Sequence, residues 1–191
     1  MTAPETAAKL TRPIVLLGMM GAGKSALGVR LAERLGVAFA DADTEIEAAA
    51  QMSIAEIFEH HGEAAFRDGE RRVIKRLLGE APHILALGGG AFINEETRAL
   101  VCETAISIWL DVPLDELVAR VGRKPHKRPL LIGQDVRAKL ESLLAERGPI
   151  YAEANLKVDV SGGSHDEAVD RLVDALSAYG ALSDKAQKLD K

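Results

Sequence analysis

Short runs of apolar residues alternate along this chain with segments whose apolar residues recur at helical spacing. The runs have the length of buried strands, and the segments between them are long enough for helices. Strands that alternate with helices in this way are typical of a parallel sheet covered by helices on both faces. We therefore predict an α/β fold with a five-stranded parallel sheet. The predicted strands are Ile14 to Leu17, Val37 to Ala40, Ile84 to Leu87, Ile106 to Leu110 and Leu156 to Val160.

Capping residues indicate where several helices begin. Ser53 and Glu56 have the spacing of a capping box, and the helix that they begin should stop near Gly62. Another helix should run from there to about Leu78. Two later helices are predicted to begin after Asp135 and to run from His165 to Leu182.

Length and composition limit the chain to one sizeable core. The 191 residues are 47% apolar and only 4% aromatic, so Ala, Leu, Val and Ile must form most of this core. We predict a single domain over residues 1–191, with its core at about 13–182 and with disordered termini, frayed to about residue 11 and from residue 183. No apolar stretch has the length of a membrane span or the pattern of a secretory signal, so we expect a soluble, cytoplasmic protein.

Charge and cysteine content exclude several kinds of partner. A formal net charge of −5 argues against nonspecific binding to nucleic acid or to a membrane, and we expect neither partner and a monomeric protein. The one cysteine, Cys102, can form neither an intramolecular disulfide nor a cysteine-based metal cage, and we expect it to be a small buried residue. An anionic ligand would have to be attracted by a local cluster of positive charge.

A glycine-rich segment between the first predicted strand and the next helix carries the most specific chemical signal. Residues 18–25 read Gly-Met-Met-Gly-Ala-Gly-Lys-Ser and fill every fixed position of the pattern Gly-x4-Gly-Lys-Ser/Thr. Backbone N–H groups of such a loop surround a polyphosphate, and the helix dipole adds to the attraction. Lys24 should reach the β- and γ-phosphates of ATP, and the Ser25 hydroxyl should bind Mg²⁺. The residues predicted to bind the nucleotide are Gly21, Ala22, Gly23, Lys24, Ser25 and Ala26.

Two aspartates follow the second predicted strand. Ligands of open parallel sheets bind beyond the carboxyl ends of the strands, which is where Asp41 and Asp43 lie. The alternation of an extended chain would direct both carboxylates the same way, so that one could serve Mg²⁺ and the other a substrate hydroxyl. Phosphoryl transfer requires that this hydroxyl be oriented and have a proton acceptor. The alternative is that either aspartate only caps the next helix.

Two further segments could contribute to a substrate pocket. Gly88, Gly89 and Gly90 follow the third strand, and their lack of side chains would let a ligand approach the backbone N–H groups, although a flexible turn is the alternative. Arg67 could face the pocket while Glu70, three positions on in a predicted helix, holds its guanidinium. An exposed ion pair is the competing interpretation.

A basic stretch without acidic residues lies between Glu116 and Asp135. We predict a mobile lid over about residues 120–135 that closes over phosphates and excludes water. A merely solvated basic loop is the alternative. Arg147 ends a later helix, where a cation complements the dipole in any case, so its position alone assigns it no function. The cations of the stretch are Arg120, Arg123, Lys124, Lys127 and Arg128.

Taken together, these segments resemble the shikimate kinase family over about Pro13 to Val160. The glycine-rich segment at residues 18–25 is shared by many kinases, whereas five matching segments in this order are far more specific to one family. The five matches are residues 18–25, Asp41-Ala42-Asp43, Phe66-Arg67-Asp68-Gly69-Glu70, Gly88-Gly89-Gly90, and Arg128-Pro129-Leu130-Leu131 with Glu146-Arg147-Gly148-Pro149-Ile150-Tyr151.

The resemblance implies a P-loop fold like that of nucleoside monophosphate kinases, with strand order 2-3-1-4-5 and a separate lid. It also implies an enzyme that uses ATP and Mg²⁺ to phosphorylate the 3-hydroxyl of shikimate, giving shikimate 3-phosphate and ADP in the chorismate route to aromatic amino acids. Either Arg120 or Arg123 would stack on adenine. A kinase for another hydroxy acid such as gluconate, or a nucleotide-dependent binding module without transfer activity, are the competing hypotheses.

The resemblance also implies roles for individual residues. Asp43, Arg67, Gly89 and Arg147 would bind shikimate, with the arginines on its carboxylate and Asp43 on the reacting hydroxyl. Asp41 would assist Mg²⁺ through water. The residues predicted to be catalytic are Lys24, Asp43 and Arg128, of which Arg128 would reach the ATP phosphates from the lid, and Gly88 and Gly90 complete the predicted substrate site.

Overall fold

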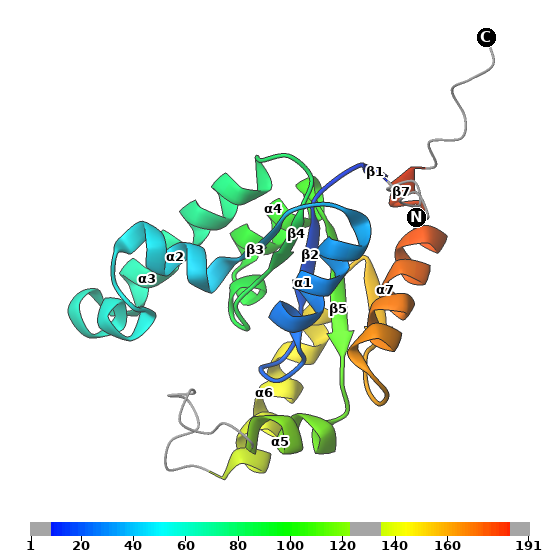
Figure 1. Ribbon diagram of the computed structural model, residues 1–191. Coiled ribbons are helices and arrows are strands. Elements are labelled where there is room, and N and C mark those ends of the chain that lie inside the picture. The colour runs from blue at the N-terminus through cyan, green and yellow to red at the C-terminus, as the bar shows by residue number, and fades with distance from the viewer. Residues whose placement is uncertain (1–8, 123–134, 184–191) are drawn as a thin grey trace, which may run out of the picture.

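Five parallel strands form the central sheet of this computed structural model, which describes residues 9–122 and 135–183 (Figure 1). The order across the sheet is β3-β4-β2-β5-β6, which is 2-3-1-4-5 when these five strands are counted along the chain. Both the parallel sheet predicted from the sequence and the order implied by the resemblance are therefore confirmed. The strands are β2 (Ile14–Leu17), β3 (Phe39–Asp41), β4 (Ile84–Ala86), β5 (Ile106–Asp111) and β6 (Leu156–Asp159).

The central strand β2 fixes the register of the sheet. Ile14 lies opposite Ile84 of β4 and Ile106 of β5, and all four residues of β2 are buried. This burial explains why the strand reads as an uninterrupted apolar run, because both of its faces are covered. Since the strands are parallel, the segments that follow them all emerge at one edge of the sheet.

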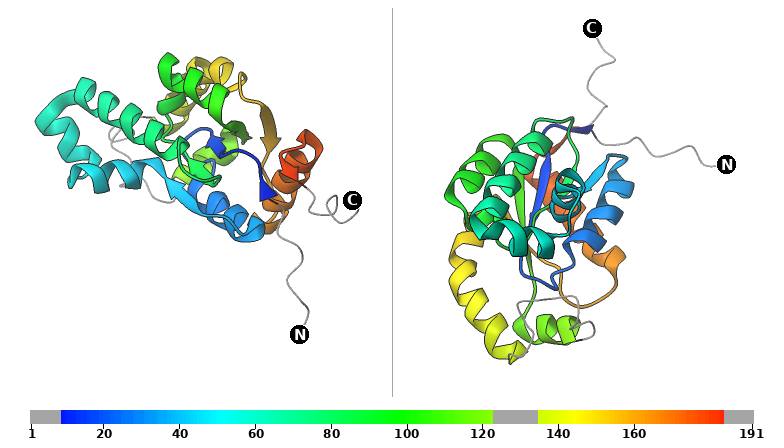
Figure 2. Two further views of the ribbon diagram at one scale, coloured as in Figure 1. Left: turned by 90° about the horizontal axis from the view of Figure 1, so that it is seen from above. Right: turned by 90° about the vertical axis from the view of Figure 1, so that its left-hand side faces the viewer.

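Helices cover both faces of the sheet (Figures 1 and 2). Helices α1 and α7 pack against each other on one face, and α4 and α6 lie on the other. Helix α2 and the first part of α3 project beyond the β3 edge of the sheet. The helices are α1 (Lys24–Leu35), α2 (Ala42–Ala50), α3 (Ile54–Leu78), the 3-10 helix η1 (Ala91–Ile93), α4 (Glu95–Thr104), α5 (Leu114–Gly122), α6 (Val136–Tyr151) and α7 (His165–Tyr179).

Helix α3 consists of two helical segments that meet at Gly62. This residue has φ 78° and ψ 174°, a conformation outside the helical region, so the break predicted there from the sequence is confirmed. The capping box at Ser53 and Glu56 and the cap at Asp135, whose side chain accepts from the N–H of Ala138, are confirmed as well.

The ends of the described chain form a small second sheet that the sequence did not predict. Strand β1 (Lys9–Leu10) pairs antiparallel with β7 (Leu182–Ser183). The expectations of fraying to about residue 11 and of a last helix to Leu182 were therefore wrong. Helix α7 ends at Tyr179 because Gly180 takes a left-handed conformation and closes the helix with backbone hydrogen bonds.

The core is built almost entirely of aliphatic residues from the sheet and the inner faces of the helices. Trp109, within the apolar run of β5, is buried in this core. Cys102 is exposed, so its predicted burial was wrong: the neighbouring Val101 faces the core, and one step along the helix turns the next side chain outward. No helix in the described part of the chain is long and apolar enough to cross a membrane.

Two helical glycines should respond in opposite ways to the same substitution. A Cβ at Gly28 would lie 2.4 Å from the ring of Phe39, whereas a Cβ at Gly69 would meet nothing within 4 Å. We expect Gly28→Ala to lower the free energy of unfolding by about 1–3 kcal/mol through overpacking. Gly69→Ala should raise it by about 0.5–1 kcal/mol, because alanine loses less backbone entropy on folding. Denaturant unfolding measures both, and equal effects would contradict this account of the α1–β3 contact.

Candidate active site

The loop between β2 and α1 has the backbone conformation that a phosphate-binding loop requires. Gly21 and Gly23 have φ of 87° and 95°, where side chains are strongly disfavoured. Gly23 is the N-cap of α1, and no side chain satisfies the first N–H groups of that helix. These N–H groups and the positive end of the dipole are therefore available to an anion.

Cations lie on both sides of this loop. The Lys24 ammonium donates to the carbonyl oxygens of Gly18 at 2.8 Å and Met19 at 3.2 Å. The Arg120 guanidinium donates to the carbonyl of Ala22 at 3.3 Å and is held by the carboxylate of Glu116 at 2.5 Å. Positive charge is therefore concentrated at the loop although the chain as a whole is acidic.

Asp41 connects the loop to the second strand. Its carboxylate accepts a hydrogen bond from the Ser25 hydroxyl at 2.5 Å and another from the backbone N–H of Asp43 at 3.1 Å. The second bond makes Asp41 the N-cap of α2. The capping alternative is thus correct for Asp41, and the same carboxylate also reaches the predicted metal-binding hydroxyl.

The two oxygen ligands at this point suit Mg²⁺. Ser25 and Asp41 offer hard oxygen donors, and the described residues include no cluster of three or more His, Cys, Asp or Glu side chains that could hold a metal ion. Mg²⁺ commonly takes few protein ligands and completes its shell with water and substrate phosphates. The donor set therefore fits a magnesium ion that enters together with a nucleotide.

Asp43 lies in the first turn of α2 and points at the turn after β4. A Cβ at Gly88 would lie 2.6 Å from Oδ1 of Asp43. Burial raises the pKa of Asp43 above its ordinary value of 3.8, and the charge of Asp41 adds to this, whereas Lys24 and Arg67 lower it. An Asp43 carboxylate with this raised proton affinity is suited to accept a proton from a substrate hydroxyl.

Arg67 and Glu70 form an ion pair at the same turn. The distance from Nη1 to Oε2 is 2.9 Å, and the Glu70 side chain is only 4% exposed, so the interpretation as an exposed ion pair was wrong. Burial raises the pKa of Glu70 above its ordinary value of 4.5, and the hydrogen bond from Arg67 opposes that shift. A Cβ at Gly90 would lie 3.2 Å from both terminal nitrogens of Arg67, which therefore lies directly against the turn.

Arg147 approaches the turn from α6. Its Nη1 donates to the carbonyl oxygen of Gly89 at 3.0 Å, while its buried Nε has no acceptor among the described residues. The Tyr151 hydroxyl donates to the same carbonyl oxygen. Sequence reasoning gave Tyr151 no role, although its spacing of four from Arg147 was a signal that both lie on one face of α6.

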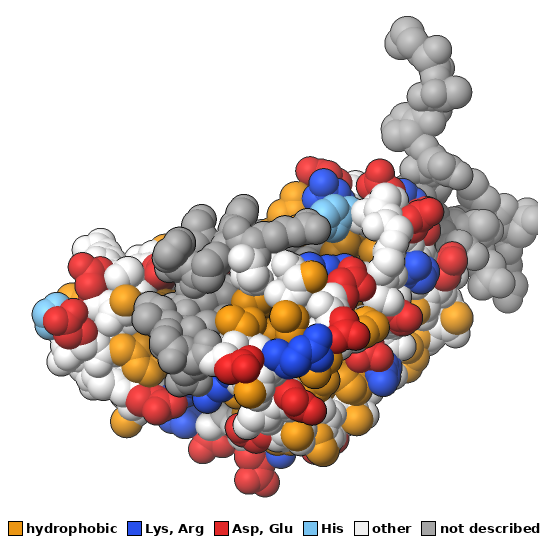
Figure 3. All heavy atoms as spheres, turned by 90° about the horizontal axis from the view of Figure 1, so that it is seen from below, with side chains coloured by type: hydrophobic (Ala, Val, Ile, Leu, Met, Phe, Trp, Pro, Cys, Tyr) orange, Lys and Arg blue, Asp and Glu red, His pale blue; other side chains and the backbone are white. Residues whose placement is uncertain are grey.

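These contacts bring the predicted substrate residues together around one turn beside the phosphate-binding loop. A Cβ at Gly89 would lie 4.0 Å from the carbonyl oxygen of Gly18, which is also an acceptor of the Lys24 ammonium. Figure 3 looks onto this side of the molecule, where acidic and basic side chains are interspersed. Arg123, Arg128 and most of the predicted lid lie outside the described residues.

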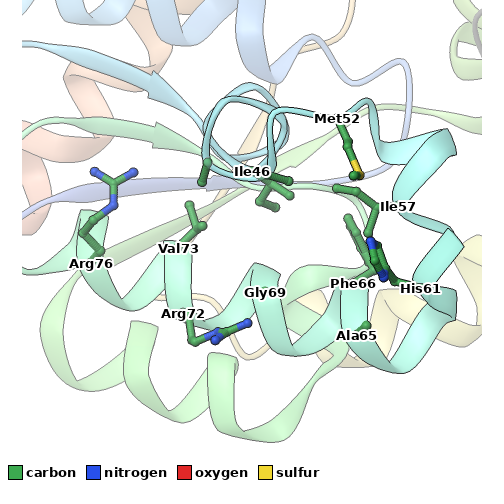
Figure 4. A pocket seen from close by; sticks show the side chains of 12 residues that line it. Ile46, Met52, Ile57, His61, Ala65, Phe66, Gly69, Arg72, Val73 and Arg76 are labelled. Carbon is green, nitrogen blue, oxygen red and sulfur yellow. The ribbon is translucent and has the colours of Figure 1, made fainter.

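A groove of about 570 Å³ lies away from this turn, between α2 and α3 (Figure 4). Ile46, Phe66 and Val73 are among the residues that line it. Arg67 and Glu70 are not part of its lining, since they face the turn after β4. The α2–α3 groove is therefore separate from the candidate site.

Removing the Asp43 carboxylate should stabilise the ligand-free protein. The folded protein raises the pKa of Asp43, so protonation of this carboxyl stabilises the folded state. This stabilisation is complete below pH 3.8, the ordinary pKa, and is lost as the pH rises through the raised pKa of the folded protein. We therefore expect Asp43→Asn to raise Tm at pH 7 by only about 1–2 °C, because the side chain is exposed enough for solvent to screen its charge. The gain should shrink towards pH 4.

Thermal unfolding between pH 4 and pH 8 measures this effect. Asp174→Asn, at an exposed position of α7, is the matched control and should leave Tm unchanged. A loss of stability in Asp43→Asn at pH 7 would contradict the argument.

Comparisons with known proteins show the family to which this chain is similar. A family model described as shikimate kinase matches residues 20–177. A shikimate kinase from Rhodopseudomonas palustris is 54% identical over 168 residues, covering 88% of this chain and 82% of its own length. A shikimate kinase from Zymomonas mobilis is 52% identical over 165 residues, covering 86% of this chain and 93% of its own length.

Solved structures give the same result. Shikimate kinase from Acinetobacter baumannii in complex with shikimate is 33% identical, with a TM-score of 0.83, and covers 88% of this chain and 94% of its own. A gluconokinase from Sinorhizobium meliloti, 19% identical with a TM-score of 0.60 over 90% of this chain and 94% of its own, shares the fold. The sequence, the fold and these matches together establish that this chain belongs to the shikimate kinase family.

Proposed function

We propose that this chain transfers the γ-phosphoryl group of ATP to the 3-hydroxyl of shikimate, giving shikimate 3-phosphate and ADP on the chorismate route to aromatic amino acids. One observation carries this proposal: Asp43, Arg67 and Arg147 meet at a single glycine turn beside the loop that holds Lys24. Family membership supports the substrate, because a small cyclic acid with several hydroxyls needs both cations and a carboxylate acceptor.

The two arginines bind the substrate carboxylate in this proposal. Arg67 and Arg147 approach the turn from different helices, so an anion between them receives donors from both sides. Glu70 keeps the Arg67 guanidinium in its orientation, and the backbone N–H groups of Gly88, Gly89 and Gly90 face a ligand without intervening side chains. Hydrogen bonds to charged groups contribute about 1.5–3 kcal/mol each, so these contacts select for an acid.

Asp43 orients the acceptor hydroxyl and takes its proton. The transition state of phosphoryl transfer is loose, so the hydroxyl needs alignment and a proton acceptor more than a strong base. Lys24 stabilises the negative charge on the β- and γ-phosphates, to which the N–H groups of Gly21, Ala22, Gly23, Lys24, Ser25 and Ala26 also donate. Positioning and electrostatics therefore provide most of the catalysis.

Ser25 and Asp41 are the residues that would hold Mg²⁺, with Asp41 acting through water. When bound, this ion neutralises phosphate charge during transfer. The hydrogen bond between Ser25 and Asp41 orients both oxygens before any ligand enters.

Arg128 completes the site from the lid in this proposal. The motif Arg128-Pro129-Leu130-Leu131 supports this role, in which Arg128 reaches the ATP phosphates and the transferred group. The lid over about residues 120–135 would exclude water and limit wasteful ATP hydrolysis. We also propose that the enzyme acts as a monomer, in the cytoplasm where ATP is supplied.

A panel of acceptors tests the substrate assignment. We expect ADP release to depend on shikimate and to exceed release with gluconate by at least about 100-fold in kcat/KM, because the two arginines and Asp43 are set for a compact cyclic acid. A coupled assay with saturating ATP and Mg²⁺ measures both acceptors. A preference for gluconate would overturn the substrate, and nucleotide binding without transfer to any acceptor would favour a binding module.

Two substitutions separate the roles of the acidic and basic groups. Asp43→Asn should lower kcat by about 10²–10⁴-fold with little change in ATP affinity, since it removes the proton acceptor.

Arg67→Lys keeps the positive charge beside Glu70 but loses the planar fork of the guanidinium, and it should raise KM for shikimate about 10-fold or more. Steady-state kinetics with each substrate varied distinguish the two patterns. Unchanged turnover in Asp43→Asn would remove Asp43 from the mechanism, and an ATP-only defect in Arg67→Lys would contradict its assignment.

A further inference from the structure

Tyr151 is a buried hydroxyl-bearing residue to which the mechanism above gives no role. It ends α6 and is 1% exposed, and its ring packs beside Trp109 with a centroid distance of 6.1 Å. Phenylalanine would fill this apolar space equally well. A buried hydroxyl is favourable only where it is hydrogen-bonded, so the bond to Gly89 is the feature that requires tyrosine.

The Tyr151 hydroxyl and the Arg147 guanidinium share one acceptor. Both donate to the carbonyl oxygen of Gly89, the tyrosine at 2.5 Å and the arginine at 3.0 Å. The two residues are four positions apart on α6 and therefore lie on one face of that helix. A carbonyl oxygen has two lone pairs, so the pair fills its hydrogen-bonding capacity.

This arrangement fixes a turn that has no side chains of its own. Because the peptide bond is planar and trans, a Gly89 carbonyl that points at α6 directs the N–H of Gly90 the opposite way. Among the described residues, the N–H groups of Gly89 and Gly90 have no hydrogen-bond acceptor. The direction of the Gly90 N–H therefore depends on the donors that α6 supplies to the Gly89 carbonyl.

We propose that Tyr151 is a positioning residue of the substrate site and that its hydroxyl keeps the Gly89 carbonyl directed towards α6. When Arg147 turns to the substrate carboxylate, the hydrogen bond from Tyr151 ensures that this carbonyl is not left unpaired. The identity of this carboxylate rests on the proposed function. An unpaired buried carbonyl is unfavourable, and its cost would otherwise be subtracted from the free energy of substrate binding. Burial raises the pKa of Tyr151 above its ordinary value of 10.0, so the hydroxyl remains a neutral donor at physiological pH.

Removing this one hydroxyl tests the proposal. Tyr151→Phe should raise KM for shikimate about 3–10-fold, the loss of one net hydrogen bond, with less than about a twofold change in KM for ATP. The matched control is Tyr179→Phe, since Tyr179 is half-exposed and its hydroxyl only accepts from Asn155. The control variant should have the same KM for shikimate as the unsubstituted protein. A lower Tm with an unchanged KM for shikimate would assign Tyr151 a merely structural role and overturn the proposal.

Hydrogen exchange in the ligand-free protein gives a second readout that needs no substrate. The amides of Ala91 and Ile93 donate to the carbonyls of Gly88 and Gly90 at 3.1 Å, so they report on the order of the turn. Tyr151→Phe should speed their exchange, and Tyr179→Phe should not. Unchanged exchange would overturn the proposal. If the unsubstituted protein released no ADP with shikimate, the proposed function would fail, while the exchange rates would still decide whether Tyr151 orders the turn.

Discussion

The turn after β4 carries three residues without side chains, and the charged groups of the site approach it from three directions. Asp43 reaches Gly88 from α2, Arg67 reaches Gly90 from α3, and Arg147 reaches Gly89 from α6. A methyl group at Gly88 would lie 2.6 Å from the Asp43 carboxylate, well inside van der Waals contact. The parallel sheet places this turn beside the phosphate-binding loop, because β4 pairs directly with β2. The site therefore depends on backbone that can be approached closely.

Desolvation disfavours the ionised form of the acidic side chains at the site, and the neighbouring Arg67 opposes this effect. Desolvation raises the pKa values of Asp43 and of the buried Glu70, and Arg67 lowers both. Glu70 keeps the Arg67 guanidinium oriented, and the charge of Arg67 favours the ionised form of both carboxylates. Because the chain is acidic overall, this local balance, rather than net charge, must attract an anionic substrate.

The sheet and the site residues could be predicted from the sequence because both leave local signals. Strands buried on two faces appear as apolar runs, and a break at Gly62 or a cap at Asp135 depends on neighbours in the sequence. Contacts between distant segments left no such signal. The pairing of β1 with β7 involves two residues from each end, and Glu70 is buried where α3 meets the turn after β4. The same limit applies to Tyr151, whose partner Gly89 is 62 positions away.

The two halves of the site belong to different parts of the molecule. Asp43 lies in the first turn of α2, directly after β3, and Arg67 lies on the part of α3 that follows the break at Gly62. Lys24 and Arg147 lie on α1 and α6. The contacts at Gly88, Gly89 and Gly90 connect Asp43 and Arg67 to Arg147, whereas Lys24 contacts the phosphate-binding loop. Since phosphoryl transfer depends on the alignment of acceptor and donor, the position of this glycine turn relative to the phosphate-binding loop bears directly on the reactive geometry.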